Sequence, residues 1–246
     1  KVGKLVRVAY WMGLDRLDDP GRLILDQQAA GQHWCARPVL LDQDLGSWRL
    51  LWWCIYRLES YANFTAGTPY MISEDASASL LPPGAQRASD SDIQMQAGTD
   101  ELYLHSELDK LRQMVPIVTK SSGPDKLFNM HLITIAAMRR VKHGLQLHHA
   151  CQQRKPNKEA AHESLGMERQ LNALRLSLPT RYLNPMRNAL EGETQIDHHS
   201  RLVTVLHLHM ARLRRRVAVK VATGAGNRAR HCRHSGTVEC CVLSER

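Results

Sequence analysis

The feature that most constrains the fold is a helical repeat of apolar residues, which recurs along the chain. From Trp48 onward, Leu51, Trp52, Ile55 and Leu58 follow at steps of three and four, which is the period of an α-helix. Two of these side chains, Trp48 and Trp52, share a face at this spacing, and we expect them to pack into the core rather than to bind a ligand. The repeat predicts a helix of about three turns.

Further stretches show the same period, and none alternates convincingly as a strand would. We place Ser47 as the N-cap of the Trp48 helix, and Gly67 and Pro69 at its end. Residues 84–99 and 152–164 are polar and predict loops. The sequence therefore predicts an all-α fold, an irregular array of helices in one domain. The other predicted helices are Val6 to Leu14, Asp100 to Val115, Lys126 to Leu147, Leu165 to Leu178 and Arg201 to Leu213.

Composition agrees with a folded chain but not with a broad nucleic-acid surface. The 246 residues suffice for a sizeable core, and all five tryptophans fall in the first 53 residues, where we expect the tightest packing. The formal charge is +9. Residues 201–246 hold ten basic and two acidic residues and so carry +8, which leaves +1 on residues 1–200. A nearly neutral body argues against a broad phosphate-binding face there, because duplex binding requires many neutralised phosphates.

The cysteines and the N-terminus indicate the cellular compartment in which we expect the chain. Six scattered cysteines without a Cys-x-x-Cys pair favour free thiols in a reducing compartment, and Cys54 lies in an apolar run that predicts burial. No stretch approaches 18 consecutive apolar residues, so we expect no membrane span, and the N-terminus lacks a signal layout. Because the first residue is Lys1, we expect the sequence to be part of a longer chain.

Two dense stretches carry a resemblance to a known family. Residues 6–16 (VRVAYWMGLDR) and residues 48–59 (WRLLWWCIYRLE) are similar to two helices of the fungal-specific transcription factor domain. The ordered set is specific: a double tryptophan, then Gly-x-Pro, then Ile-x-x-Asp, then Leu-Pro. In this chain the later members, at the family's spacing, are Gly67 to Pro69, Ile72 to Asp75, and Leu80 to Pro82.

The resemblance weakens along the chain. It is strong over residues 5–83, continues to residue 213 through the segments 174–179 and 200–213, and is absent after that. Two departures stand in the strong part: Asp15 replaces a common histidine, and Thr68 replaces the usual arginine before proline. The resemblance implies that residues 1–213 form the regulatory domain, without its first helices, and that residues 214–246 are a basic tail.

In that family the domain is the helical middle region of zinc-cluster transcription factors. The resemblance therefore implies a nuclear regulator whose DNA contacts and zinc ions belong to a separate N-terminal module. This chain lacks that module's cysteine pattern. It also implies a homodimer, a co-regulator or a small-molecule effector as partners, no cofactor in this chain, and no enzymatic activity.

For the residues that could bind a metal or act in catalysis, we favour structural or solvated roles. His207 and His209 are two apart, so on a helix they point about 200° from one another and do not form a metal site. The carboxylates of Glu74 and Asp75 are adjacent on an extended segment and point apart. We expect the remaining candidates to be solvated, structural or locally paired, with Arg49 and Arg57 pairing with Glu59 or Asp75. Those candidates include His148, His149, Cys151, His198, His199, His231, Cys232, His234, Cys240 and Cys241.

Three function classes remain from the sequence. The first is the regulatory domain of a transcription factor; the second is a helical scaffold of the same fold without transcriptional activity; the third is an enzyme whose site carries no recognisable motif. The tail from Arg214 has its own alternatives. Its arginines are typical of nuclear localisation or of nonspecific nucleic-acid contact, and its abrupt change of composition is equally typical of a shifted reading frame or a retained intron.

Overall fold

The regular structure of this chain is helical. The computed structural model describes residues 1–19, 45–73, 78–82, 102–121, 125–152, 158–184, 186 and 188–213, with the side chains of residues 147–164 left aside. Within these ranges no strand forms, and one isolated antiparallel bridge joins Leu80 to Tyr103. The predicted all-α class is confirmed. The tail 214–246 and the linker 84–99 lie outside the described residues.

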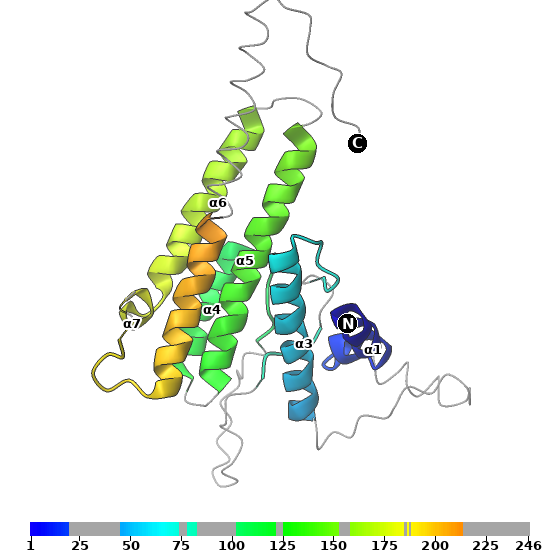
Figure 1. Cartoon of the computed structure of the whole chain (residues 1–246), viewed down its shortest axis with the longest axis vertical. Helices are drawn as coiled ribbons and strands as arrows, with labels where there is room; N and C mark the ends of the chain where they lie inside the picture. The colour runs from blue at the N-terminus through cyan, green and yellow to red at the C-terminus, as the bar shows by residue number, and fades with distance from the viewer. Residues whose placement is uncertain are drawn as a thin grey trace, which may run out of the picture.

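The helices arrange themselves around α5 (Figure 1). On one side of α5 lies α3, with α1 packed against it; on the other side lie α4, α6 and the helix over residues 195–213, drawn in orange. In the part of the chain that the structure describes, no helix is long and apolar enough to cross a membrane. The elements are α1 Val2–Trp11, the 3-10 turn η1 Leu14–Arg16, α3 Leu45–Ala66, α4 Leu108–Lys120, α5 Asp125–Gln152, α6 Lys158–Ser177 and α7 Thr180–Leu183.

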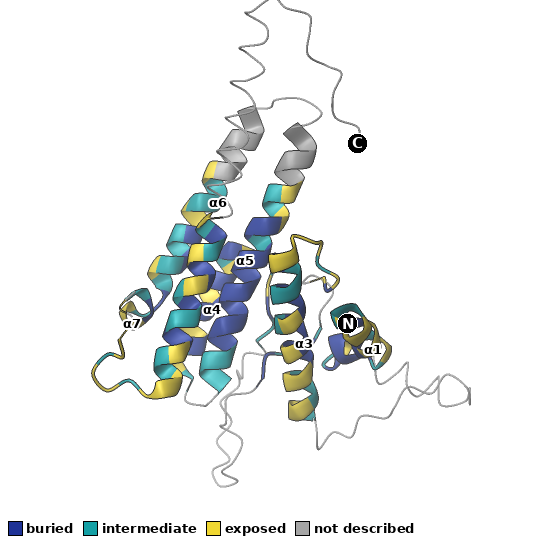
Figure 2. Ribbon diagram, in the orientation of Figure 1, coloured by how far each residue is buried: buried dark blue, intermediate teal, exposed yellow. Residues whose placement is uncertain are grey.

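The centre of the core is α5, which lies outside the tryptophan-rich N-terminal third where the sequence predicts the tightest packing. Residues 129–139 of this helix are all buried, which spans three full turns (Figure 2). A helix enclosed on all sides must be apolar around its circumference, and this stretch supplies Met130, Leu132, Ile133 and Ile135 with no exposed surface. Neighbouring helices can therefore pack on α5 from several directions.

The tryptophans form a second part of the core between α1 and α3. Trp52 is fully buried, as predicted, and its ring meets those of Tyr10 and Trp53 edge-on, with centroids 5.7 and 6.4 Å apart. The indole N–H of Trp53 donates to the carbonyl of Leu80 at 2.7 Å. Trp48 is only partly buried and packs at the margin of this cluster. These rings hold α1 and residues 80–82 against α3.

Several predicted boundaries were wrong. Helix α3 begins at Leu45, so Ser47 lies inside the first turn and is not its N-cap, whereas the predicted end at Gly67 is confirmed by a positive φ of 73°. Helix α4 begins at Leu108, not near Asp100, although Leu104 before it is still buried. The polar residues 152–164, predicted as a loop, include the start of α6.

Two side-chain predictions on α3 were also wrong. Cys54 is exposed, because it falls on the outer stripe of the helix with Leu51 and Leu58. Arg49 pairs with Asp18, both nearly buried, rather than with an acid farther along the chain. The guanidinium of Arg57 lies over the ring of a phenylalanine, Phe128, at 5.0 Å. The error for Arg49 concerns a partner that is distant in sequence, whereas the error for Cys54 concerns the face of the helix on which it lies.

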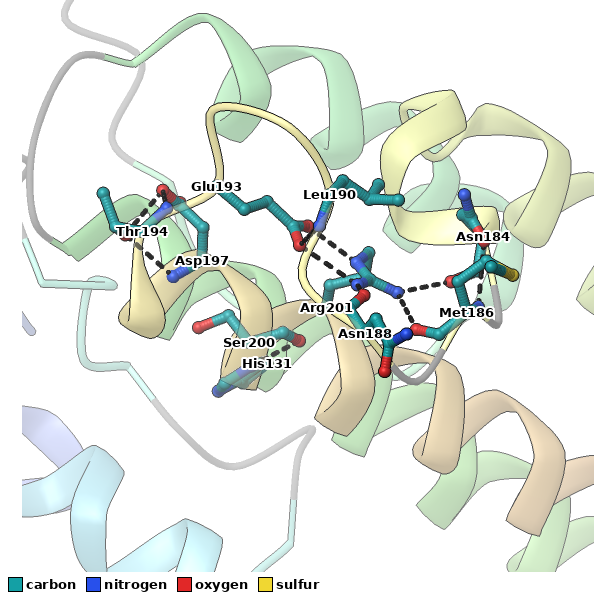
Figure 3. Close-up of polar contacts among 10 residues, drawn as sticks. All are labelled: His131, Asn184, Met186, Asn188, Leu190, Glu193, Thr194, Asp197, Ser200 and Arg201. Atoms are coloured by element: carbon teal, nitrogen blue, oxygen red, sulfur yellow. Dashed lines mark hydrogen bonds and ion pairs between the residues drawn. The ribbon is translucent and has the colours of Figure 1, made fainter.

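A buried arginine anchors the loop before the 195–213 helix (Figure 3). Arg201 has 1% of its surface exposed and donates to the carbonyls of Asn184, Met186 and Asn188 at 2.8 to 2.9 Å. It also forms two hydrogen bonds with the carboxylate of Glu193, at 2.6 and 3.0 Å. Hydrogen bonding from Arg201, and then from the Leu190 N–H, lowers the pKa of Glu193 to about 2. This carboxylate therefore stays ionised well into the acid range.

The same helix begins with a capping box (Figure 3). The backbone N–H of Asp197 donates to the hydroxyl of Thr194 at 3.1 Å, and the Asp197 carboxylate accepts from the Thr194 N–H at 3.4 Å. Two donors that the helix would otherwise leave unpaired are thus satisfied. The start of the helix is fixed six residues before the predicted Arg201.

The tryptophan cluster gives a stability prediction. Replacing Trp52 by alanine removes a large, fully buried side chain, so the free energy of unfolding should fall by about 3–5 kcal/mol in a denaturant titration. The matched control is Trp11→Ala on α1, whose side chain is 64% exposed, and which should leave the midpoint nearly unchanged. Equal effects of the two substitutions would contradict the assignment of Trp52 to the core.

Candidate functional site

The histidine pair singled out in the sequence separates as predicted. On the 195–213 helix, His207 has 1% of its surface exposed, whereas His209 faces solvent. Among the described residues, no three His, Cys, Asp or Glu side chains converge on a point that could hold a metal ion. The other candidates, Glu74, Asp75, His148, His149, Cys151 and the tail residues, belong to segments or side chains outside the described part of the chain.

A buried polar cluster surrounds His207, which the sequence did not predict. Its Nε2 lies 2.6 Å from the Tyr61 hydroxyl of α3, and its Nδ1 lies 2.8 Å from the Thr134 hydroxyl of α5. Beside it, His131 of α5 donates from Nε2 to the carbonyl of Ser200 at 3.2 Å, and the two imidazole centroids are 6.0 Å apart. The cluster therefore joins α3, α5 and the 195–213 helix at one place.

The hydrogen bonds of this cluster suit a neutral imidazole. The Thr134 hydroxyl lies 3.0 Å from the carbonyl of His131, an acceptor, so it donates there and accepts from His207 Nδ1–H. His207 Nε2 is then left to accept from Tyr61. Protonation of His207 at Nε2 would place an N–H against the Tyr61 hydroxyl, and the hydrogen bond that Tyr61 donates there would be lost. The cluster is thus a packing element that specifies one protonation state.

The environment keeps both histidines uncharged at neutral pH. Burial lowers the pKa of His207 to about 3, and the nearby His131 and Arg57 act in the same direction. Burial lowers the pKa of His131 to about 4; the hydrogen bond to Ser200 opposes this shift, while Arg57 and His199 add to it. Because both rings lie in the interior, they are not positioned to take a proton from a bound substrate. We assign this cluster a structural role.

A cavity lies elsewhere, where the end of α3 meets α5. It has a volume of about 380 Å³, within the range of about 300–1,000 Å³ typical of small-molecule sites. One wall is the segment 69–73 that follows Gly67, and the opposite wall comes from the outer half of α5. The lining residues are Pro69, Tyr70, Met71, Ile72, Ser73, Ser106, Arg139, Arg140, His143 and Gln146.

The floor of this cavity is an ion pair that the sequence missed. Arg139 Nη1 donates to Glu59 Oε2 at 2.5 Å and to the Ser60 hydroxyl at 2.8 Å, and its Nη2 donates to the carbonyl of Ile72. Glu59 has no exposed surface, and its other oxygen accepts from the Met71 N–H at 2.6 Å. These three contacts, from α3 and from the segment that follows it, leave the guanidinium little freedom to move.

Aromatic contacts complete the floor. The guanidinium of Arg139 lies between the rings of Tyr56 and Tyr70, with its central carbon 4.5 and 4.0 Å from their centroids. The ammonium of Lys142 lies 4.4 Å from the same Tyr70 ring. Two cations of α5 thereby fix the orientation of Tyr70, which forms part of the cavity wall.

A sequence signal for this site existed. Within the apolar pattern of α5, Arg139, Arg140, Lys142 and His143 interrupt the run over little more than one turn. Positive residues at consecutive positions of a helix face different directions, so some must enter the interior and find partners there. This pattern predicts that basic residues of α5 enter the interior, but it does not identify Glu59, which lies 80 residues from Arg139 in the sequence.

The buried histidines give a prediction about pH. An unfolded histidine has a pKa of about 6.5, above both folded values, so the unfolded state binds more protons below that pH. Stability should be complete above pH 6.5 and should fall as the pH drops towards 4. The loss should be about 2 kcal/mol per histidine between pH 8 and pH 5. Urea titrations at several pH values measure it.

A matched pair of variants tests the origin of this dependence. His207→Gln removes one buried titrating group and should flatten the dependence of the free energy of unfolding on pH. The exposed neighbour supplies the control, and His209→Gln should keep the wild-type slope. A slope that is unchanged in His207→Gln would show that this ring does not titrate as its surroundings require.

Comparisons with protein-family models, with curated proteins and with solved structures find no match for this chain. Interpretation of its function therefore depends on the ordered sequence motifs and on the geometry described above.

Proposed function

We propose that this chain is the regulatory domain of a fungal zinc-cluster transcription factor, acting in the nucleus with DNA contacts supplied by a separate zinc module. The observation that carries the proposal is the sequence resemblance, in which four motif segments follow one another in the family's order. The structure supports it in one respect: all of these segments, where described, belong to one packed unit of the fold.

Asp18 is the centre of that unit. Its carboxylate accepts from Arg49 of α3 at 3.0 Å and from the backbone N–H of Leu80 at 2.7 Å. Asp18, two residues after the first similar stretch (residues 6–16), thereby links that stretch to both the double-tryptophan helix and the Leu-Pro segment. Residues separated by more than 60 positions in sequence meet through a single carboxylate.

Ser79, directly before the Leu-Pro segment, adds a second link to the first similar stretch. Its hydroxyl donates to the carbonyl of Leu14 at 2.5 Å and accepts from the N–H of Leu17 at 3.2 Å. The backbone N–H of Ala78 donates to the carbonyl of Asp15 at 2.7 Å. Within the motifs themselves, the Trp53 indole N–H donates to the Leu80 carbonyl, and the Trp52 ring meets that of Tyr10. Members of the set thus pack on one another, which favours the resemblance over a chance match of short strings.

A reporter assay tests the proposed function. The full 246-residue chain is fused to a heterologous DNA-binding module in a yeast strain whose reporter carries the matching site. A regulatory domain should raise or lower reporter output several-fold relative to the module alone. The Trp52→Ala fusion should lose the effect because its core is damaged, and the Trp11→Ala fusion should keep it.

A different outcome would favour the scaffold alternative. If the fusion accumulates to the level of the module alone and leaves the reporter unchanged in both rich and minimal medium, the transcriptional proposal is wrong. A zinc-cluster cysteine pattern encoded upstream in the same gene would support the proposal independently of the reporter.

The charge distribution predicts how this chain behaves towards DNA. Residues 214–246 hold eight basic and two acidic residues, so they carry +6 and leave +3 on residues 1–213. The intact chain should bind duplex DNA weakly, without sequence preference, and with an affinity that falls steeply as salt rises. In a fluorescence titration, truncation after Leu213 should abolish this binding.

The structure sets the position of that truncation. A cut after His199, at the end of the nearly neutral body, would remove Arg201, Thr204 and His207, which are buried. Cutting after Leu213 retains the whole 195–213 helix. Salt-resistant, sequence-selective binding by residues 1–213 would mean that the helical domain reads DNA itself.

A further inference from the structure

We propose that the cavity between residues 69–73 and α5 binds a small organic anion, a carboxylate or a phosphate ester that also carries an apolar group. The inference rests on the proposed function, because it names the class of effector that the regulatory domain would sense.

The charged residues described in the lining carry one sign. Among the described residues that line the cavity, Arg139 and Arg140 are arginines and none is acidic. Glu59, beneath the floor, has no exposed surface and offsets the charge of Arg139, so the net positive charge of the described lining comes from Arg140. The ammonium of Lys142 lies behind the wall residue Tyr70 and adds a further positive charge. The field inside the cavity therefore favours an anion.

The rim places donors where an anion would lie. Arg140 and His143 are three residues apart on α5, so their side chains emerge from the same face of the helix one turn apart. Arg140 is partly exposed and His143 is exposed, so both can reach a ligand from solvent. Arginine suits this position because its planar fork pairs with two oxygens of a carboxylate or phosphate.

The walls set the rest of the ligand. Pro69, Tyr70 and Met71 present an aromatic ring and apolar atoms along one side, and Ser73 and Ser106 add hydroxyl groups. Met71 is 48% exposed, so apolar surface at this mouth is open to contact. A bare inorganic ion would leave that surface unused, whereas an anion on an apolar group would cover it. The cavity volume of about 380 Å³ fits a molecule of metabolite size.

The floor is built before any ligand arrives. Arg139 is held by Glu59, Ser60 and the Ile72 carbonyl, and it also fixes Tyr70 from below. A site whose walls are already ordered loses less conformational entropy when it binds. The rim residues can therefore be exchanged without removing the floor, which makes the site testable.

Binding of four probes to the full chain tests the proposal. Benzoate and phenyl phosphate combine an anion with a ring; benzamide is the uncharged analogue of benzoate; inorganic phosphate is an anion without a ring. Ligand-observed NMR and the thermal midpoint, at millimolar probe, give affinity and stabilisation. Benzoate or phenyl phosphate should bind and raise the midpoint, benzamide should not, and inorganic phosphate should bind more weakly than phenyl phosphate.

Two arginine substitutions locate the site. Arg140→Gln removes the rim fork and should weaken the anionic probes by about tenfold or more without lowering the midpoint of the free protein. Arg112→Gln is the matched control, since this arginine is exposed on α4 and does not line the cavity. It removes the same charge from the chain and should leave binding unchanged.

Three results would overturn the proposal. They are equal binding of benzoate and benzamide, equal losses in the two arginine variants, and no binding of either aromatic anion to the wild type. None of these results would bear on the reporter assay. A regulator without an anion site and an anion site without transcriptional activity can therefore be told apart.

Discussion

The ion pair between Glu59 and Arg139 is the interaction on which the junction of α3 and α5 depends. Both side chains are enclosed, with 0% and 3% of their side-chain surface exposed, so each would be costly to bury alone. Each is also saturated by further partners. Glu59 accepts from the side chain of Asn63 at 2.6 Å and from the backbone of Met71. Replacing one member would leave a buried charge, which costs about 3–5 kcal/mol in other proteins.

The consequence of this pair is geometric as well as energetic. Because Glu59 holds the N–H of Met71 and Arg139 holds the carbonyl of Ile72, the segment after α3 is fixed at two consecutive residues. Lys142 continues the pattern by donating to the carbonyls of Asn63 and Thr68, at 2.8 and 2.5 Å. A cation at the C-terminal end of a helix also compensates the partial negative charge there. The cavity wall is thus a product of charges placed on α5.

The polar residues of α5 specify neighbours that apolar packing alone would not distinguish. His131 and Thr134 select the 195–213 helix, whereas Arg139 and Lys142 select the end of α3. Asn129 adds a hydrogen bond to the carbonyl of Pro82 at 3.0 Å. An apolar surface can slide or rotate with little loss, but a buried donor has few acceptors in reach. We attribute the unique arrangement around α5 to this set of contacts.

The sequence predicted the helical class and the main helices, because the apolar period is a local property. It placed α5 within a few residues and identified Trp52 as a core residue. It failed at the start of α6, where polar composition was interpreted as a loop. Residues 158–165 read KEAAHESL, however, and Lys, Glu, Ala and Leu are strong helix formers whether or not they are apolar. The helix propensity summed over residues 158–165 would have predicted the start of α6.

The site escaped sequence analysis for another reason. Nothing local connects Glu59 to Arg139 or Tyr61 to His207, because their separations are 80 and 146 residues and only the packed helices bring them together. The pairing of Arg49 was also missed, because its partner Asp18 lies 31 residues before it in the sequence, whereas the predicted partners lie after it. Charge pairing follows tertiary proximity, and a periodic pattern carries no information about which helices become neighbours.

The division between a fixed floor and an open rim limits what the cavity can do. Arg139 is committed to Glu59, Ser60 and Ile72, so it contributes field and shape rather than a movable contact. Discrimination among ligands then falls to Arg140 and His143, which are accessible, and to the apolar wall. Such a site suits recognition of a ligand, because its accessible charged group and its apolar wall lie side by side. A binding role agrees with a regulatory domain and requires no reaction.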